Sequence, residues 1–152
     1  LAGCSKDPNP ETVAMIYSIT LFYAGLSGLL LLALSWQVVA LRRRFKVGLG
    51  TGSQPELERV VRVHANFCEY VPLALLILLT LELSGALPAV LLHALGVALV
   101  LGRFLHAWGL SRTAGVSRGR FIGTLLTWLM LLAGSLLAVG MALGGWWFTL
   151  GG

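Results

Sequence analysis

Four apolar stretches, each long enough to cross a lipid bilayer as a helix, constrain this chain more than any other feature. The first runs from Val13 to Leu41 without a charged residue. A helix needs about 20 apolar residues to cross a hydrocarbon core roughly 30 Å thick. We expect the other spans at residues 57–83, 87–110 and 120–143. The prediction is an all-α membrane protein, in which four transmembrane helices form one antiparallel bundle over residues 13–148.

The composition agrees with this assignment and excludes a nucleic-acid-binding function. Only 11% of the 152 residues are charged, whereas soluble domains have roughly 25%. The net charge of +5 comes largely from two short basic segments, residues 42–46 and 112–120, which end the first span and precede the fourth. Basic loops stay on the cytoplasmic side of a membrane. We therefore expect these segments in the cytoplasm and both termini on the opposite side.

Residues 1–12 form a polar leader that contains Asp7, Pro8 and Pro10. Residues 1–4 resemble a bacterial lipoprotein cleavage box. We favour a simpler interpretation, in which Met15 is a natural start and the segment before it takes no part in the fold.

A polar stripe marks the beginning of the second span. In a helix, Arg62, Asn66 and Glu69 recur at i, i+4 and i+7 and so share one face, with Tyr70 beside them. Ionisable groups at membrane depth are costly, and they indicate either a functional site or an internal ion-pair network. Both alternatives are open on this stretch alone.

The other spans bring further polar side chains to the same end of the bundle. Arg42 ends the first span, Arg103 and His106 lie near the end of the third, and Arg120 begins the fourth. These cations outnumber Glu69, the one acid of the stripe. Arginine forks bind carboxylates, and a carboxylate binds an amine. The surplus of cations therefore favours a small zwitterionic ligand over a self-contained network.

These segments resemble a known family. Residues 62–72 closely resemble the second-helix signature of the MAPEG family, the membrane-associated proteins in eicosanoid and glutathione metabolism. Residues 37–47 resemble the family's first-helix exit, and residues 102–109 its third-helix end in bacterial form. The resemblance extends from Met15 to Met141. It implies a homotrimer in the bacterial inner membrane, with glutathione bound as co-substrate between neighbouring subunits and a lipophilic substrate arriving from the bilayer.

The resemblance also implies roles for individual residues. One subunit would hold glutathione through the second-helix stripe, and the next would reach it through Arg42 and His64. The complete set of expected binding residues is Arg42, Arg62, His64, Asn66, Glu69, Tyr70, Arg103 and His106.

Activation of the glutathione thiol is assigned to an arginine at the start of the fourth helix. Arg120 matches the family's activating residue, and Arg118 is the alternative because the loop before it varies in length. The chain departs from the family pattern at His106 and Leu110, where leukotriene C4 synthase, a member of the family, has tyrosines.

Three further residues carry expectations of their own. We expect Glu82, at the far end of the second span, to be solvated, and His93 to form a hydrogen bond between helices. Cys68 is i+4 from His64, but no third ligand is evident. We therefore expect Cys68 to be a small packing residue, and no metal site.

The predicted function is a glutathione-dependent transferase or peroxidase that acts on lipophilic electrophiles. The alternative is a non-catalytic membrane subunit or scaffold that keeps the fold and its ion network. A proton-coupled transporter ranks third, because transporters need an acid near mid-membrane and Glu69 lies near one end of its span.

Overall fold

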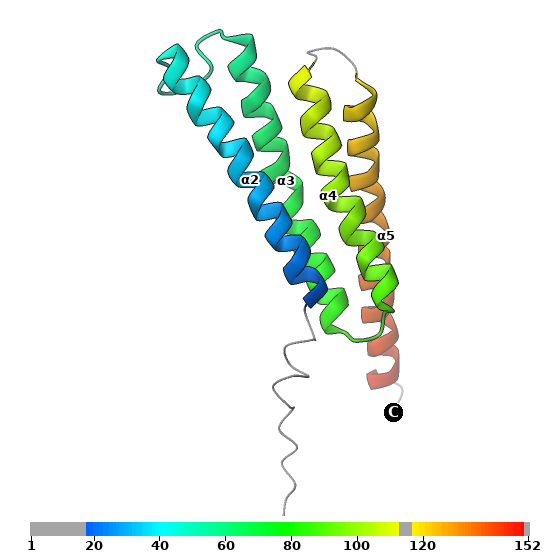
Figure 1. Ribbon diagram of the computed structural model, residues 1–152. Coiled ribbons are helices and arrows are strands. Elements are labelled where there is room, and N and C mark those ends of the chain that lie inside the picture. Colours follow the sequence, from blue (N-terminus) through cyan, green and yellow to red (C-terminus); the bar gives the residue numbers. More distant parts are fainter. Residues whose placement is uncertain (1–17, 113–116, 151–152) are drawn as a thin grey trace, which may run out of the picture.

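The computed structural model describes residues 18–112 and 117–150, and it describes side chains as far as Leu110 and from Ser117 to Gly145. These residues form four helices (Figure 1): α2 (Ser18–Phe45), α3 (Pro55–Leu83), α4 (Ala89–Arg112) and α5 (Arg118–Leu150). Each is long and apolar enough to cross a membrane. The predicted all-α, four-span architecture is thus confirmed. The leader at residues 1–12 lies outside the described residues.

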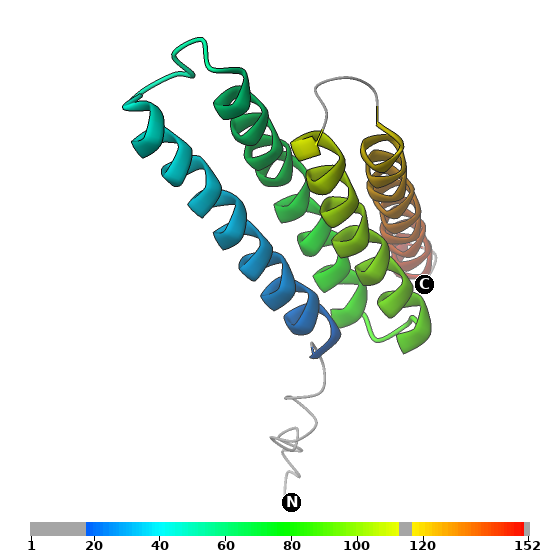
Figure 2. The same ribbon diagram turned by 45° about the horizontal axis from the view of Figure 1, so that its top comes forward.

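The helices run antiparallel, so that alternate connections lie at opposite ends. The last turn of α2, the first of α3, the last of α4 and the first of α5 share one end, the upper end in Figures 1 and 2. We call it the basic end, because α2 finishes there in three consecutive arginines. The opposite turn begins at Gly85, whose φ of 65° lies in the left-handed region that glycine adopts without strain.

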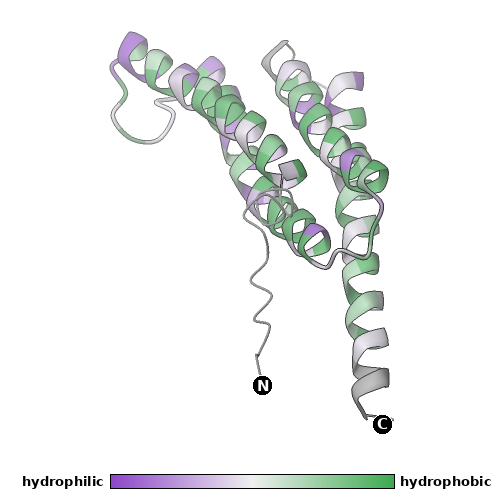
Figure 3. Ribbon diagram, turned by 60° about the horizontal axis from the view of Figure 1, so that its bottom comes forward, coloured by the Kyte–Doolittle hydropathy of each residue, from purple (hydrophilic) through white to green (hydrophobic). Residues whose placement is uncertain are grey.

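The apolar surface is divided between a narrow core and a broad exterior. Leu57, Leu78, Leu99 and Met130 are almost completely buried between helices. Many other leucines and aromatic residues are exposed, and Figure 3 shows apolar residues along most of each helix. Exposed apolar area on this scale is normal where lipid, rather than water, surrounds the protein.

Glycines allow the backbones of α4 and α5 to approach closely at the basic end. A Cβ atom added at Gly102 would stand 2.9 Å from the carbonyl oxygen of Gly123, and one at Gly109 would stand 2.6 Å from the Arg120 nitrogen. A Cβ at Gly123 would meet the backbone of His106. Small residues at a helix crossing are the usual means of close packing in membranes. This contact sets the distance between the side chains of His106 and Arg120.

Glu82 is buried rather than solvated, contrary to the sequence-based expectation. Its side chain is 7% exposed. Its two carboxylate oxygens accept hydrogen bonds from the backbone nitrogens of Ile19 and Thr20, at 2.8 and 2.7 Å. The first amides of a helix have no partner within the helix, and the positive end of its dipole favours an anion. Glu82 therefore anchors the beginning of α2 to the end of α3.

The expected interhelical hydrogen bond of His93 is confirmed. The Tyr23 hydroxyl lies 3.1 Å from Nδ1 of His93 and 3.2 Å from its carbonyl oxygen. The same tyrosine ring lies against Gly96, where no side chain intervenes. Tyr23 and His93 thus join α2 to α4 away from the basic end.

Substituting Gly123→Ala should separate α4 from α5. The new methyl group would overlap the His106 backbone, and overpacking of this kind costs about 1–3 kcal/mol. Thermal unfolding in detergent would measure the change. Gly140→Ala is the matched control on the same helix, since nothing lies within 4 Å of its Cβ position. The control should be neutral or stabilising by up to about 1 kcal/mol; equal losses for both variants would contradict the close contact.

Substituting Glu82→Gln should destabilise the bundle, because the amide replaces one of the two acceptor oxygens and the charge at the start of α2 is lost. We expect a loss of about 1–2 kcal/mol, measured as a lower midpoint of thermal unfolding. Glu58→Gln removes an exposed first-turn acid of α3 and should cost no more than about 0.5 kcal/mol. An effect at Glu82 as small as at Glu58 would show that the cap contributes little.

Candidate functional site

A polar cavity of about 250 Å³ lies at the basic end, between three helices. Helix α3 contributes Arg62 and Asn66, α4 contributes His106 and Leu110, and α5 contributes Arg120. Each pair on one helix is spaced i, i+4, which places both side chains on the same face. The structure thus brings together four polar residues that the sequence predicted to converge.

Arg103 lies beside this cavity without lining it. The guanidinium is 3% exposed and donates through Nη1 to Oδ1 of Asn66 at 2.6 Å, through Nε to Oγ1 of Thr127 at 2.9 Å, and through Nη2 to the Gly123 carbonyl at 3.2 Å. It also stands 5.2 Å from the centre of the Tyr70 ring. A buried charge is tolerated only when its donors are satisfied. Arg103 therefore acts as an internal brace that joins α3, α4 and α5.

The brace fixes the orientation of Asn66. Because Oδ1 of Asn66 accepts the hydrogen bond from Arg103, its amide nitrogen remains as the group that a ligand in the cavity can contact. The guanidinium groups of Arg62 and Arg120 are donors as well. The polar cavity is thus cationic and rich in donors, an arrangement that favours carboxylates.

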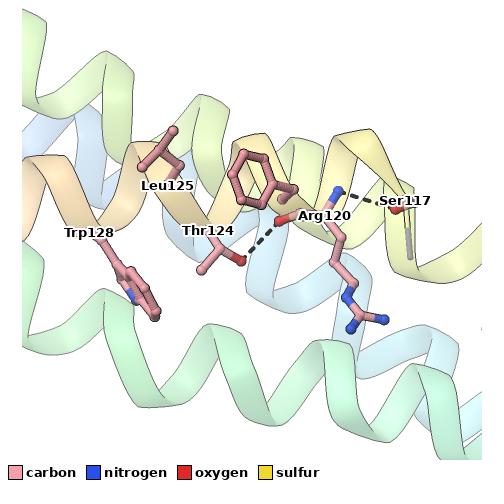
Figure 4. A pocket seen from close by; sticks show the side chains of 6 residues that line it. Ser117, Arg120, Thr124, Leu125 and Trp128 are labelled. Atoms are coloured by element: carbon pink, nitrogen blue, oxygen red, sulfur yellow. Dashed lines mark hydrogen bonds between the residues drawn. The ribbon is translucent and has the colours of Figure 1, made fainter. Parts of the chain in front are cut away.

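A second, apolar cavity of about 290 Å³ runs along α5 (Figure 4). Its lining residues are Ser117, Arg120, Phe121, Thr124, Leu125 and Trp128. Figure 4 shows Arg120 and Trp128 extending to the same side of α5 and Leu125 to the other. The indole nitrogen of Trp128 donates to the Tyr70 hydroxyl at 3.4 Å. Arg120 lines both cavities, so that one guanidinium lies where polar and apolar compartments meet.

Besides Arg103, four predicted binding residues do not line the polar cavity: Arg42, His64, Glu69 and Tyr70, of which Tyr70 lies against Arg103. Arg42 donates to the carbonyl oxygens of Val47 and Gly48, at 3.4 and 3.2 Å, in the connection that follows α2. His64 faces α2, where its Nε2 lies 3.0 Å from Oγ of Ser35. Glu69 is exposed. Arg62 and His64 therefore contact different surroundings, as their separation around the helix predicts.

Within the described part of the chain, Arg62 and Glu69 do not join an internal ion-pair network, although Asn66 and Tyr70 engage the buried Arg103. Neither Arg62 nor Glu69 forms an ion pair there. The ion pair that the structure records joins Arg44 to Glu56 at 3.8 Å, with both side chains exposed. Cys68 is also exposed, with its Sγ 3.9 Å from Nδ1 of His64. The expectation that Cys68 is a small packing residue is therefore not met within this chain.

Sequence reasoning missed three residues of α5 that support the site. Thr124 forms a hydrogen bond with His106, Thr127 accepts one from Arg103, and Trp128 donates one to Tyr70. Thr124 and Trp128 follow Arg120 at i+4 and i+8, so they continue its face of the helix. That periodicity was a usable signal, although it did not indicate which partners these residues meet.

Comparisons with known proteins show the family to which the chain is similar. A sequence model of the MAPEG family matches residues 20–140. The inner membrane protein YecN of Escherichia coli strain K12 is 37% identical over 114 residues, which cover 75% of this chain and 85% of YecN. YecN of the Escherichia coli strain CFT073 gives the same identity and coverage.

Substituting Arg103→Lys should destabilise the basic end, because an ammonium group cannot reach all three acceptors of the fork. Leaving buried polar groups without partners costs about 1–3 kcal/mol, which should lower the midpoint of thermal unfolding in detergent. Arg118→Lys is the control, since Arg118 is exposed at the start of α5. If both variants unfold at the same temperature, Arg103 is not the brace described here.

Proposed function

The chain belongs to the MAPEG family of membrane proteins, and from that membership and the two adjoining cavities we propose a membrane-embedded, glutathione-dependent transferase or peroxidase. Its second substrate is a lipophilic electrophile. The observation that carries the proposal is the position of Arg120, which lines both the polar and the apolar cavity. We propose that the protein lies in the bacterial inner membrane, as the name of its relative YecN states for that protein, and that its basic end faces the cytoplasm.

In this proposal the polar cavity receives the carboxylates of glutathione. Arg62 and the Asn66 amide supply donors from α3, and the Arg103 brace keeps the amide in place. Arg42, His64 and Glu69 do not line the cavity of one subunit. They are available to complete the site across a subunit boundary, as the homotrimer implied by the family would require.

Arg120 stabilises the reactive thiolate. A free thiol has a pKa of about 8.5 and is mostly protonated at neutral pH. A guanidinium beside the sulfur favours the anion, and each pKa unit of that preference corresponds to about 1.4 kcal/mol. Arg118, the alternative activator, is exposed and lines neither cavity. The geometry therefore supports Arg120 for this role.

The apolar cavity receives the lipophilic electrophile. Phe121, Leu125 and Trp128 supply its apolar lining, and all three side chains are exposed on the subunit surface. A substrate dissolved in the bilayer can reach such a cavity sideways, without passing through water. Its electrophilic centre then lies beside the guanidinium that holds the thiolate, and proximity of the two reactants lowers the barrier.

Substituting Arg120→Ala should remove most of the thiolate of bound glutathione. We expect the thiolate fraction near neutral pH, measured by ultraviolet absorbance of detergent-purified protein, to fall by about tenfold or more, which corresponds to about one pKa unit. Arg118→Ala is the matched control, two residues away on α5, and it should keep the wild-type signal.

The same absorbance measurement, made while glutathione is added to wild-type protein, tests the alternative of a non-catalytic scaffold. Wild-type protein that binds no glutathione at millimolar concentrations would contradict the transferase proposal and favour a structural role. Binding with a thiolate signal that depends on Arg118 and not on Arg120 would keep the function and reassign the activating residue.

A further inference from the structure

We propose that His106 is the base that accepts the proton of the ligand thiol through its Nε2 atom and returns it to the product. This inference rests on the proposed function and extends it, because it assigns the path of the proton to a residue that departs from the family pattern. Two observations carry it, the hydrogen bonds of His106 and the supply of acceptors in the polar cavity, and the charges around the ring set the condition under which it can hold a proton.

The contacts of Thr124 indicate which nitrogen of His106 carries the hydrogen. The Thr124 hydroxyl donates its one proton to the carbonyl oxygen of Arg120 at 2.9 Å. Its Oγ1 also lies 3.1 Å from Nδ1 of His106. With the hydroxyl proton assigned to that carbonyl, Nδ1 is the donor in this second contact. A neutral His106 therefore has its hydrogen on Nδ1 and a lone pair on Nε2.

Among the side chains that line the polar cavity, His106 offers a proton acceptor, its Nε2 atom. Arg62 and Arg120 have donors alone, and Leu110 has no polar atom. The oxygen of Asn66 is occupied by Arg103 at 2.6 Å. A thiol that enters this donor-rich cavity thus has the histidine nitrogen as its acceptor among the lining side chains.

The charged groups near His106 come from each helix that packs around it. Arg103 on α4 and Arg120 on α5 both oppose a positive charge on the ring, and Arg62 on α3 lines the same cavity. A proton that reaches Nε2 comes from the thiol, so the ring gains a positive charge as the sulfur gains a negative one. The sulfur anion, held beside Arg120, offsets both the new charge on the ring and its repulsion by the arginines, so His106 keeps the proton only while the thiolate is present.

The complete step balances without an added oxidant or reductant. For an electrophilic alkene conjugated to a carbonyl, the S–H bond breaks and an Nε2–H bond forms. The sulfur then bonds to the β-carbon, and the π electrons of the alkene move toward the carbonyl. The adjacent carbon takes the proton back from Nε2, which yields a thioether and neutral His106. Proton transfer by a positioned histidine typically accelerates a reaction by 10²–10⁴-fold.

The experiment compares wild-type protein with His106→Asn. The asparagine amide retains a donor for Thr124 but places no atom at the Nε2 position. Protein is mixed rapidly with glutathione in weak buffer that contains a pH indicator, and thiolate absorbance and proton release are followed together. Wild-type protein should form thiolate with little release of protons to the solvent. The variant should form thiolate roughly 100-fold more slowly, and each thiolate that forms should release about one proton.

Affinity for glutathione is measured separately by calorimetry, so that rate and proton release are compared at saturating glutathione and loss of the base is separated from loss of binding. His106→Gln is the second variant, because its amide reaches further toward the Nε2 position yet cannot accept a proton; it should show the same slow rate and the same proton release. Unchanged rate and proton release in both variants would overturn the role of His106 while leaving the proposed function in place. Absence of glutathione binding to wild-type protein would overturn both.

Discussion

The close approach of α4 and α5 is the constraint on which the basic end depends. At Gly102 and Gly123 the two backbones leave no room for a Cβ atom, and Gly109 meets the Arg120 nitrogen in the same way. This short separation lets Arg103 reach Thr127 and the Gly123 carbonyl across the crossing. With a wider crossing, His106 would lose Thr124, Arg103 would lose two acceptors, and the polar cavity would lose its defined walls.

Two arginines at this end have different roles because their surroundings differ. Arg103 is buried, and its guanidinium is used by acceptors from α3 and α5, so it contributes rigidity. Arg120 lines two cavities, so its guanidinium is within reach of whatever enters them. The cost of burying a charge explains the difference: a guanidinium in a dry site is retained when protein groups satisfy it.

The sequence was sufficient to predict what depends on hydropathy and helical periodicity. Four spans, a shared basic end and the cluster of Arg62, Asn66, His106 and Arg120 follow from those patterns. The brace at Arg103 could not be predicted, because its partners Thr127 and Gly123 depend on the register between two helices. Glu82 was misjudged because it precedes Ser84 and Gly85, which mark an exposed turn, while the amides that it binds lie more than 60 residues earlier. The spacing of Gly119 and Gly123 was a readable signal for the helix crossing.

The shared position of Arg120 has a consequence for how two ligands influence each other. An anion in the polar cavity and an apolar molecule along α5 would contact the same guanidinium, which has a single set of donors and one position at a time. Binding free energies that depend on a common group are linked, and the linkage is reciprocal. Whatever factor the first ligand applies to the affinity of the second, the second must apply to the first, whichever of them arrives earlier.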